Sequence, residues 1–283
     1  MLQEWPLPRP SGDSDKEGRG SVLVVGGEVS LPGAVVLAGI AALRAGAGKL
    51  QIATCRSIAP LVGVTVPEAL AIGLDETRAG NISSTAVRQL RPLVDKADAI
   101  LIGPGMTGNE DERRFVIDLL AACNDVQAVI DAGALDALAD FPSAIHKFNG
   151  KAVITPHAGE MARLTETTPD SVTQNPERTA SDVSTTLNAV VALKGARTFI
   201  ASPDGDLFCY EAGDVGLATS GSGDTLAGVI AGLVARGASP LHAALWGVFL
   251  HGSAGNRLAK RIGRIGYLAR ELLDEIPPIM NRV

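Results

Sequence analysis

Short apolar runs alternate with longer segments of helical character through most of this chain. Such runs, almost free of polar positions, are typical of strands buried on both faces of a parallel sheet. They lie at 21–27, 49–54, 97–102, 128–131, 151–155 and 189–194. Helical segments lie at 35–45, 83–94, 110–122, 159–165 and 176–188. Because parallel strands need crossover connections, this order predicts an α/β sandwich, with helices on both faces of a mostly parallel sheet.

The last third of the chain departs from this alternation. Residues 198–202 and 207–210 are short apolar runs joined by a Pro-Asp-Gly-Asp turn, which predicts a late antiparallel hairpin. Further helices are expected at 224–236, at 240–260 and near 267–275, the last ending before Pro277 and Pro278. Residues 1–20 are polar and predict an arm outside the core. With no repeat or linker, a single domain over residues 1–283 is expected.

Composition argues against several classes of function. A net charge of −6, 4% aromatic residues and the lack of a Lys/Arg cluster disfavour nucleic-acid binding. Cys55, Cys123 and Cys209 are odd in number and form no CxxC pair, so we expect reduced thiols. The first residues carry no apolar stretch of a secretory signal, and no apolar run is long enough for a membrane span. We therefore expect a cytoplasmic protein without a membrane partner.

A glycine-rich loop at 217–224 leads directly into the helix expected at 224–236. Gly221, Ser222 and Gly223 have small or absent side chains, so backbone amides at the helix start can face an anion such as phosphate. Asp224 follows at once, where a carboxylate can take a proton from a hydroxyl that attacks a phosphoryl group. The alternative is structural: Ser222 caps the helix and Asp224 complements its dipole. The loop alone does not decide between the two interpretations.

Residues able to bind ligands follow several of the predicted strands. They are Gly26, Gly27, the segment 103–105, Asp131, His157 and Lys194. In a doubly wound sheet, ligands bind beyond the carboxyl ends of the strands. The sequence therefore predicts that these residues share one site, although a lone lysine such as Lys194 can also be an ordinary surface charge.

Other motifs are weaker candidates. GPGMTG at 103–108 fits the dinucleotide fingerprint G-x-G-x-x-G, with Asp131 as its acidic partner. That unit lies well inside the sheet and leaves residues 221–224 unexplained, so a Rossmann dehydrogenase is disfavoured, while a plain glycine turn stays open. His157 and Glu160 have the spacing of zinc ligands, but no further His or Cys completes the set. Glu160 can instead approach Mg²⁺ through water, or be a first-turn helix carboxylate.

At these residues the chain closely resembles the ADP/ATP-dependent NAD(P)H-hydrate dehydratases, which belong to the ribokinase-like superfamily. The matching segments run almost from end to end and are specific in their order and spacing. They are 33–34, AALRAGAG at 41–48, IGPG at 102–105, VIDAGAL at 129–135, ITPHAGE at 154–160, LKGA at 193–196, PDG at 203–205, 220–228 and 251–252. The resemblance implies a three-layer ribokinase-like sandwich. It also implies a homo-oligomer, a tetramer, and a dehydratase that carries no epimerase domain.

The same resemblance implies a division of the site between two ligands. Residues implied to contact the hydrated dinucleotide are Ala34, Gly105, His157 and Asp224. Residues implied to hold the adenine nucleotide are Lys194, Gly195, Ala196, Arg197, Thr198 and Gly223. Glu160 would act on Mg²⁺ through water. Two positions depart from the family pattern: Ser220 replaces a glycine and Asp214 an asparagine, and either change can weaken nucleotide binding.

The implied reaction is the dehydration of the (S)-hydrate of NADH or NADPH, driven by ADP or ATP. Asp224 would accept the proton of the ring C6 hydroxyl as that hydroxyl attacks the terminal phosphate, and phosphate would then leave. The family resemblance favours ADP, and no residue ranks NADH-hydrate against NADPH-hydrate. Two alternatives remain: a ribokinase-like kinase of a vitamin or sugar alcohol, and a nucleotide-sensing subunit without catalysis.

Overall fold

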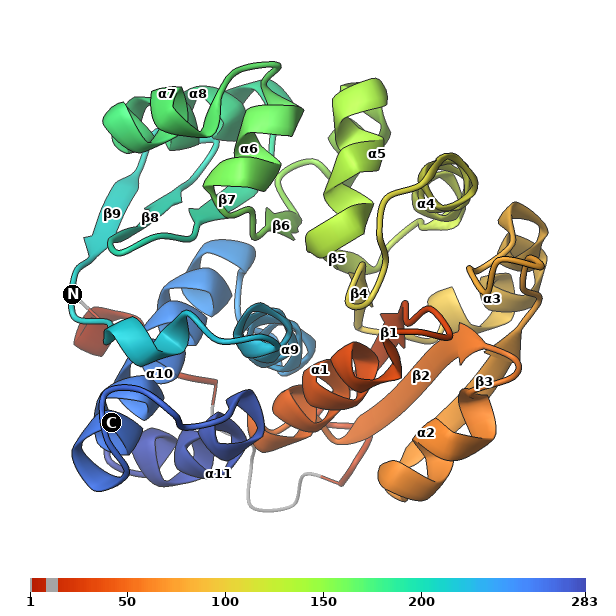
Figure 1. The fold of residues 1–283 in the computed structure, drawn as a ribbon, viewed down its shortest axis with the longest axis horizontal. Helices are drawn as coiled ribbons and strands as arrows, with labels where there is room; N and C mark the ends of the chain where they lie inside the picture. Colours follow the sequence, from red (N-terminus) through yellow and green to blue (C-terminus); the bar gives the residue numbers. More distant parts are fainter. Residues whose placement is uncertain (1, 9–14) are drawn as a thin grey trace.

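The computed structural model describes residues 2–8 and 15–283, which contain a nine-stranded sheet in the order β3-β2-β1-β4-β5-β6-β7-β8-β9 (Figure 1). All neighbours from β3 to β7 pair in parallel, whereas β8 is antiparallel to β7 and β9 to β8. The mostly parallel sheet and the late hairpin are thus confirmed. The strands are β1 (Ser21–Val25), β2 (Lys49–Cys55), β3 (Ala69–Leu74), β4 (Ala99–Ile102), β5 (Gln127–Ile130), β6 (Ala152–Ile154), β7 (Val190–Leu193), β8 (Thr198–Ala201) and β9 (Leu207–Tyr210).

Helices cover both faces of this sheet, and each layer encloses its own buried apolar cluster (Figure 1). One layer holds α1 (Pro32–Arg44), α2 (Ala59–Thr65), α9 (Ser222–Ala235), α10 (Pro240–Arg261) and α11 (Ala269–Met280). The other holds α3 (Val87–Val94), α4 (Glu110–Ala122), α5 (Leu135–Asp140), α6 (Ala158–Leu164), α7 (Pro169–Gln174) and α8 (Pro176–Leu187). The expected three-layer sandwich is confirmed.

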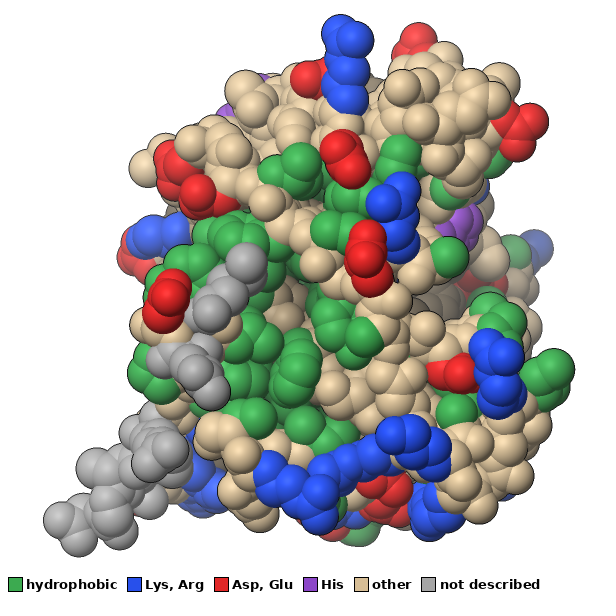
Figure 2. All heavy atoms as spheres, turned by 90° about the vertical axis from the view of Figure 1, so that its left-hand side faces the viewer, with side chains coloured by type: hydrophobic (Ala, Val, Ile, Leu, Met, Phe, Trp, Pro, Cys, Tyr) green, Lys and Arg blue, Asp and Glu red, His purple; other side chains and the backbone are tan. Residues whose placement is uncertain are grey.

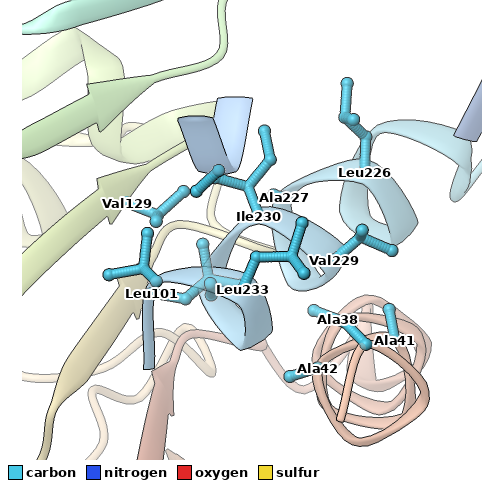
Figure 3. Close-up of a cluster of buried hydrophobic side chains, with 14 of the residues drawn as sticks. Ala38, Ala41, Ala42, Leu101, Val129, Leu226, Ala227, Val229, Ile230 and Leu233 are labelled. Atoms are coloured by element: carbon cyan, nitrogen blue, oxygen red, sulfur yellow. The ribbon is translucent and has the colours of Figure 1, made fainter. Parts of the chain in front are cut away.

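Helix α9 is buried between the sheet and α1. Figure 3 shows its apolar side chains between Leu101 and Val129 of the sheet and the alanines of α1. A Cβ atom on Gly228 would overlap the backbone carbonyl of Ala38, so the two helices touch backbone to backbone at that point. This close packing fixes where α9 begins, and the glycine-rich loop is attached to that end.

Four elements lie where the sequence predicts none: α2, β3, α5 and α7. The three helices have six or seven residues each, which is too short for a helical period to stand out or for a helix to be stable alone. Strand β3 is at the edge of the sheet, and it pairs with β2 on one side only. Packing onto larger neighbours, rather than local preference, therefore forms these elements.

The expected end of the last helix is wrong. Helix α11 runs through Pro277 and Pro278 to Met280, although neither proline can donate a helix hydrogen bond. Ile276 and Ile279 are at most 4% exposed and pack into the core on either side of the pair. Tertiary packing of these side chains outweighs the local cost of the prolines.

The described part of the N-terminal segment also contacts the core, which its polar composition does not predict. Leu2, Trp5 and Leu7 pack against the buried cluster. The Trp246 indole of α10 donates to the carbonyl of Trp5 at 2.7 Å, and the Trp5 ring stacks on His242 at 4.9 Å. Hydrophobic side chains gather on the face of the molecule that lies on the side of β9 and α10 (Figure 2). Residues 1 and 9–14 of the expected arm lie outside the described residues.

Candidate active site

The loop before α9 leaves backbone donors without a partner at the start of the helix. Gly221 precedes the helix with φ of +85°, a left-handed conformation that favours glycine. The Ser222 amide donates to the Thr219 carbonyl at 3.2 Å and is used inside the loop. In the part of the chain that the structure describes, the amides of Gly223 and Asp224 have no acceptor. The loop thus offers two first-turn donors to an anion, where the helix dipole assists binding.

The side chain of Ser222 does not cap α9, because Gly221 occupies the capping position. Instead, the Ser222 hydroxyl lies 2.9 Å from Nε2 of His251, a buried histidine of α10. Burial lowers the pKa of His251 to about 4, and the charge of Lys194 lowers it as well, against the effect of a hydrogen bond with the Ser222 backbone. The imidazole is therefore neutral at neutral pH.

Asp131, Glu160 and Lys194 form a charged cluster beyond the carboxyl ends of β5, β6 and β7. Asp131 is 2% exposed, and its Oδ1 accepts from the Thr155 hydroxyl at 2.7 Å and from the Lys194 amine at 2.8 Å. The same amine lies 3.8 Å from Oε2 of Glu160. A Cβ on Gly223 would lie 3.3 Å from this amine, so the cluster adjoins the loop. The sequence alone marks Asp131 as a polar residue at a strand end but indicates no role for it in catalysis.

The charged cluster perturbs the carboxyl of Asp224, in the first turn of α9. Burial raises the pKa of Asp224 to about 7, the charges of Asp131 and Glu160 raise it too, and Lys194 opposes them. The pKa of Lys194 is itself raised, because Asp131 and Glu160 outweigh the effect of burial. A carboxyl that titrates near neutral pH is suited to accept a proton during a reaction.

His157 and Glu160 stabilise the start of α6. Nδ1 of His157 accepts from the amides of Gly159 and Glu160 at 3.0 and 3.2 Å, and Oε2 of Glu160 accepts from the His157 amide at 2.7 Å. This reciprocal capping box gives Glu160 the structural role of a first-turn carboxylate. Among the described residues, no three His, Cys, Asp or Glu side chains are arranged to hold a metal ion. The donor set fits Mg²⁺ reached through water, not a cage of direct protein ligands.

The structure brings Ala34 and Gly105 together beside the glycine-rich loop. Gly105 has φ of +72°, and a Cβ there would lie 3.1 Å from that of Ala34, so the loop after β4 contacts α1. Leu37, one turn after Ala34, contacts the loop in turn: a Cβ on Gly221 would lie 2.5 Å from its methyl group. These residues thus form one side of the site.

A cavity of about 700 Å³ adjoins the loop, large enough for a nucleotide. The expected residues that line it are His157, Lys194, Gly195, Ala196, Thr198, Ser222 and Gly223. Arg197 is not among them: its guanidinium lies 5.2 Å from the Phe199 ring centroid and 3.6 Å from the Glu211 carboxylate. The wall also includes Tyr210, Leu217, Val248 and His251, for which the sequence alone indicates no binding role. Tyr210 lies on β9, Leu217 in the short turn Val215–Leu217, and the other two on α10, so only the fold brings them to one wall.

The two departures from the family pattern lie beside this cavity. Asp214 lines it, accepts from the Gly216 amide at 3.0 Å and pairs with the Arg264 guanidinium at 3.1 Å. The Gly216 amide and then Arg264 lower the pKa of Asp214. Its charge is therefore balanced inside the protein instead of standing free against a nucleotide. Ser220 is exposed.

The strand order and this site define an α/β protein of ribokinase-like fold. A ribokinase-like superfamily protein from Enterococcus faecalis aligns with a TM-score of 0.86 at 27% identity, over 99% of this chain and 93% of that one. The ADP/ATP-dependent NAD(P)H-hydrate dehydratase from Bacillus subtilis, co-crystallised with ATP/Mg²⁺, aligns with a TM-score of 0.80 at 31% identity, over 98% and 95%.

Residues 22–278 match the NAD(P)H-hydrate dehydratase family, and the chain belongs to that family. The ADP-dependent (S)-NAD(P)H-hydrate dehydratase from Xanthomonas campestris is 48% identical over 284 aligned positions, covering 100% of this chain and 94% of the relative. The chain spans about half the length (52%) of bifunctional NAD(P)H-hydrate repair enzymes that it also matches. Within residues 2–8 and 15–283, no helix has the length and apolar character that a membrane crossing needs.

Proposed function

We propose that this protein catalyses the nucleotide-dependent dehydration of the (S)-hydrates of NADH and NADPH, a metabolite-repair reaction of the lyase class. The observation that supports this proposal most directly is the position of Asp224. Its carboxyl titrates near neutral pH, in a helical turn where the amides of Gly223 and Asp224 have no acceptor among the described residues. The names of the relatives support this function over a vitamin or sugar kinase. They also support ADP as the phosphoryl donor, with ATP as the second choice.

Two binding regions meet at the glycine-rich loop. We assign the adenine nucleotide to the cavity, where Gly223 and the segment from Lys194 to Thr198 would hold it; within that segment Arg197 would act from outside the wall. We assign the hydrated dinucleotide to the side of Ala34 and Gly105, with His157 and Asp224 between the two ligands. This arrangement would direct the terminal phosphate of one ligand toward the ring hydroxyl of the other.

The proposed reaction balances in two steps. The C6 hydroxyl oxygen forms a bond to the terminal phosphorus, the bond from that phosphorus to the bridging oxygen breaks, and Asp224 takes the hydroxyl proton. ADP would leave as AMP, with the amides of Gly223 and Asp224 stabilising charge on the transferred group. The ring nitrogen lone pair then expels phosphate from C6, and loss of a proton from C5 restores the dihydronicotinamide. Phosphorylation is needed because hydroxide is a poor leaving group.

Magnesium is part of the proposal. Glu160 would hold it through water, at a site adjoining Lys194 and the loop, and the ion would neutralise charge on the nucleotide phosphates. The capping bond from the His157 amide engages one oxygen of Glu160, so this role rests on the other. Omitting Mg²⁺ should lower turnover, and Glu160→Gln should raise the Mg²⁺ concentration that half-maximal turnover requires.

The central test is Asp224→Asn. We expect it to lower turnover by at least about 10³-fold while ADP affinity changes by less than about threefold, because the isosteric amide cannot accept the proton. The assay supplies hydrated NADH with ADP or ATP and follows both dihydronicotinamide absorbance and free phosphate. Near-normal turnover by the variant would refute the role of Asp224. A stable phosphorylated product would establish the kinase alternative, and binding without turnover by the unaltered protein would establish the sensor.

We further propose that the protein is a cytoplasmic homotetramer and that residues 1–283 form a single domain. The family resemblance and the hydrophobic side chains on the face shown in Figure 2 support self-association, as do the exposed side chains of Leu207 and Val215. Light scattering after gel filtration measures the mass directly, and a monomer would overturn the oligomeric part of the proposal.

A further inference from the structure

A buried hydrogen bond joins α10 to the first turn of α9. The Ser222 hydroxyl and Nε2 of His251 are 2.9 Å apart, and the two residues are 4% and 9% exposed. Both line the cavity next to the free amide of Gly223. The proposed reaction assigns no role to this pair, although a buried polar pair interacts strongly with a charged ligand bound beside it.

The position of one hydrogen decides what the Ser222 hydroxyl can do. A neutral imidazole carries a hydrogen on only one nitrogen, and His251 is neutral at neutral pH. If Nε2 carries it, the ring donates to Ser222 Oγ and the hydroxyl hydrogen is available to another acceptor. If Nε2 is bare, Ser222 donates to the ring, and only oxygen lone pairs face the cavity. An anion is stabilised by the first arrangement and repelled by the second.

The hydrogen bond between Ser222 and His251 does not by itself select between these tautomers. Among the described residues, the side-chain hydrogen bond of the His251 ring joins its Nε2 to the Ser222 hydroxyl, and that bond is compatible with either tautomer. The Lys194 amine and the amides of Gly223 and Asp224 place hydrogen-bond donors for phosphate at this end of the cavity. The occupant that suits these groups therefore also selects the Nε2–H tautomer.

We propose that His251 is a positioning residue: it donates from Nε2 to Ser222 and thereby commits the Ser222 hydroxyl to a phosphate oxygen of the bound nucleotide. Ser222, whose amide is used inside the loop, joins the anion site through its side chain instead. This inference rests on the proposed function, because it needs an adenine nucleotide in the cavity. Binding measurements test it without any catalytic turnover.

The first experiment compares ADP with adenosine by titration calorimetry on the full chain. Ser222→Ala and His251→Leu should each weaken ADP binding about tenfold, the effect of a lost hydrogen bond to a charged group, and leave adenosine binding unchanged. The double variant should bind ADP no more weakly than either single variant, because both changes remove one donor. His251→Gln keeps a nitrogen donor and should stay within about threefold of the unaltered protein. His242→Leu, on the same helix outside the cavity, is the matched control and should change neither affinity.

The second experiment reads the tautomer directly from the ¹⁵N imidazole shifts of the unaltered protein, which has four histidines. The His251 signals, assigned from their loss in His251→Gln, should show a protonated Nε2 and a bare Nδ1 when ADP is bound. A bare Nε2 with ADP bound would overturn the proposal. So would equal losses for ADP and adenosine, additive losses in the double variant, or ADP binding unaffected by Ser222→Ala.

The outcomes of the controls distinguish a failure of the role proposed for His251 from a failure of the proposed function. If His251→Leu fails to fold, as thermal unfolding will show, Ser222→Ala and the tautomer measurement carry the test. An unaltered protein that binds ADP in the expected manner but dehydrates no hydrate would refute the proposed function and leave the role of His251 standing. A protein that binds no adenine nucleotide would overturn both.

Discussion

Removing the charge of Asp131 should shift the pH dependence of the reaction toward acid. The charge of Asp131 raises the pKa of Asp224, whereas that of Lys194, with which Asp131 pairs, lowers it. Asp131→Asn removes the negative charge but keeps an oxygen that can accept from Thr155 and Lys194, as the carboxylate does now. The variant therefore tests electrostatics with little change in shape.

The size of the effect follows from the position of the pKa. Asp224 rises from 3.8 to about 7, roughly three units or about 4 kcal/mol in favour of the protonated form. A base must be ionised, so activity is lost as pH falls through this value: about nine-tenths is ionised at pH 8 and about one-tenth at pH 6. The rate constant kcat/KM should therefore fall about tenfold over that range. A downward shift of about one unit in Asp131→Asn would raise the ionised fraction at pH 6 about fivefold.

The assay is kcat/KM for hydrated NADH at saturating ADP, from pH 5.5 to 8.5, normalised to each protein's own plateau. Normalisation matters because Asp131→Asn can also change the plateau itself. Asp140→Asn is the control, since Asp140 is exposed, pairs with Arg113 and does not perturb Asp224. A flat profile for the unaltered protein would refute Asp224 as the base, and identical profiles for it and Asp131→Asn would refute the charge of Asp131 as a cause of the raised pKa.

Three further variants test other parts of the structure. Gly223→Ala should weaken ADP binding about tenfold in calorimetry, because its Cβ would lie 3.3 Å from the Lys194 amine. The melting temperature should not fall, because alanine favours the helix. Unchanged ADP affinity would contradict this prediction. Asp214→Asn should leave KM for ADP within about twofold, since its ion pair is balanced and partly exposed; a larger rise would show that the charge matters. Burial and then Glu28 raise the pKa of Glu112, so this group favours the folded state below the ordinary glutamate pKa, and that contribution is lost as pH rises. Glu28→Gln should therefore increase the free energy of unfolding in urea by roughly 1 kcal/mol at pH 7 and by less at pH 5, and a decrease at both would refute the repulsion.

Local pattern was enough to predict most of the sheet and the helices that flank it. The expected 110–122 helix matches α4, and the apolar runs ending near Val25, Ile102 and Leu193 became parallel strands. These elements are long or strongly apolar, so the pattern of their own residues predicts that they are buried. The short helices and the proline-containing end of α11 were missed because neighbours that are distant in sequence stabilise them.

The same distinction between local pattern and tertiary packing applies to the candidate site. By itself the sequence determined that glycine-rich segments and polar residues would gather at the carboxyl ends of the strands, because parallel topology carries every strand end to one edge. Only the tertiary structure decided which of them touch: Asp131 reaches Lys194 across 63 positions, and Ser222 reaches His251 across 29. It also decided that Arg197 lies outside the cavity wall and that Asp224 titrates near neutral pH. Contacts and pKa values depend on distances of a few ångströms and on burial, and these arise only when separate elements pack together.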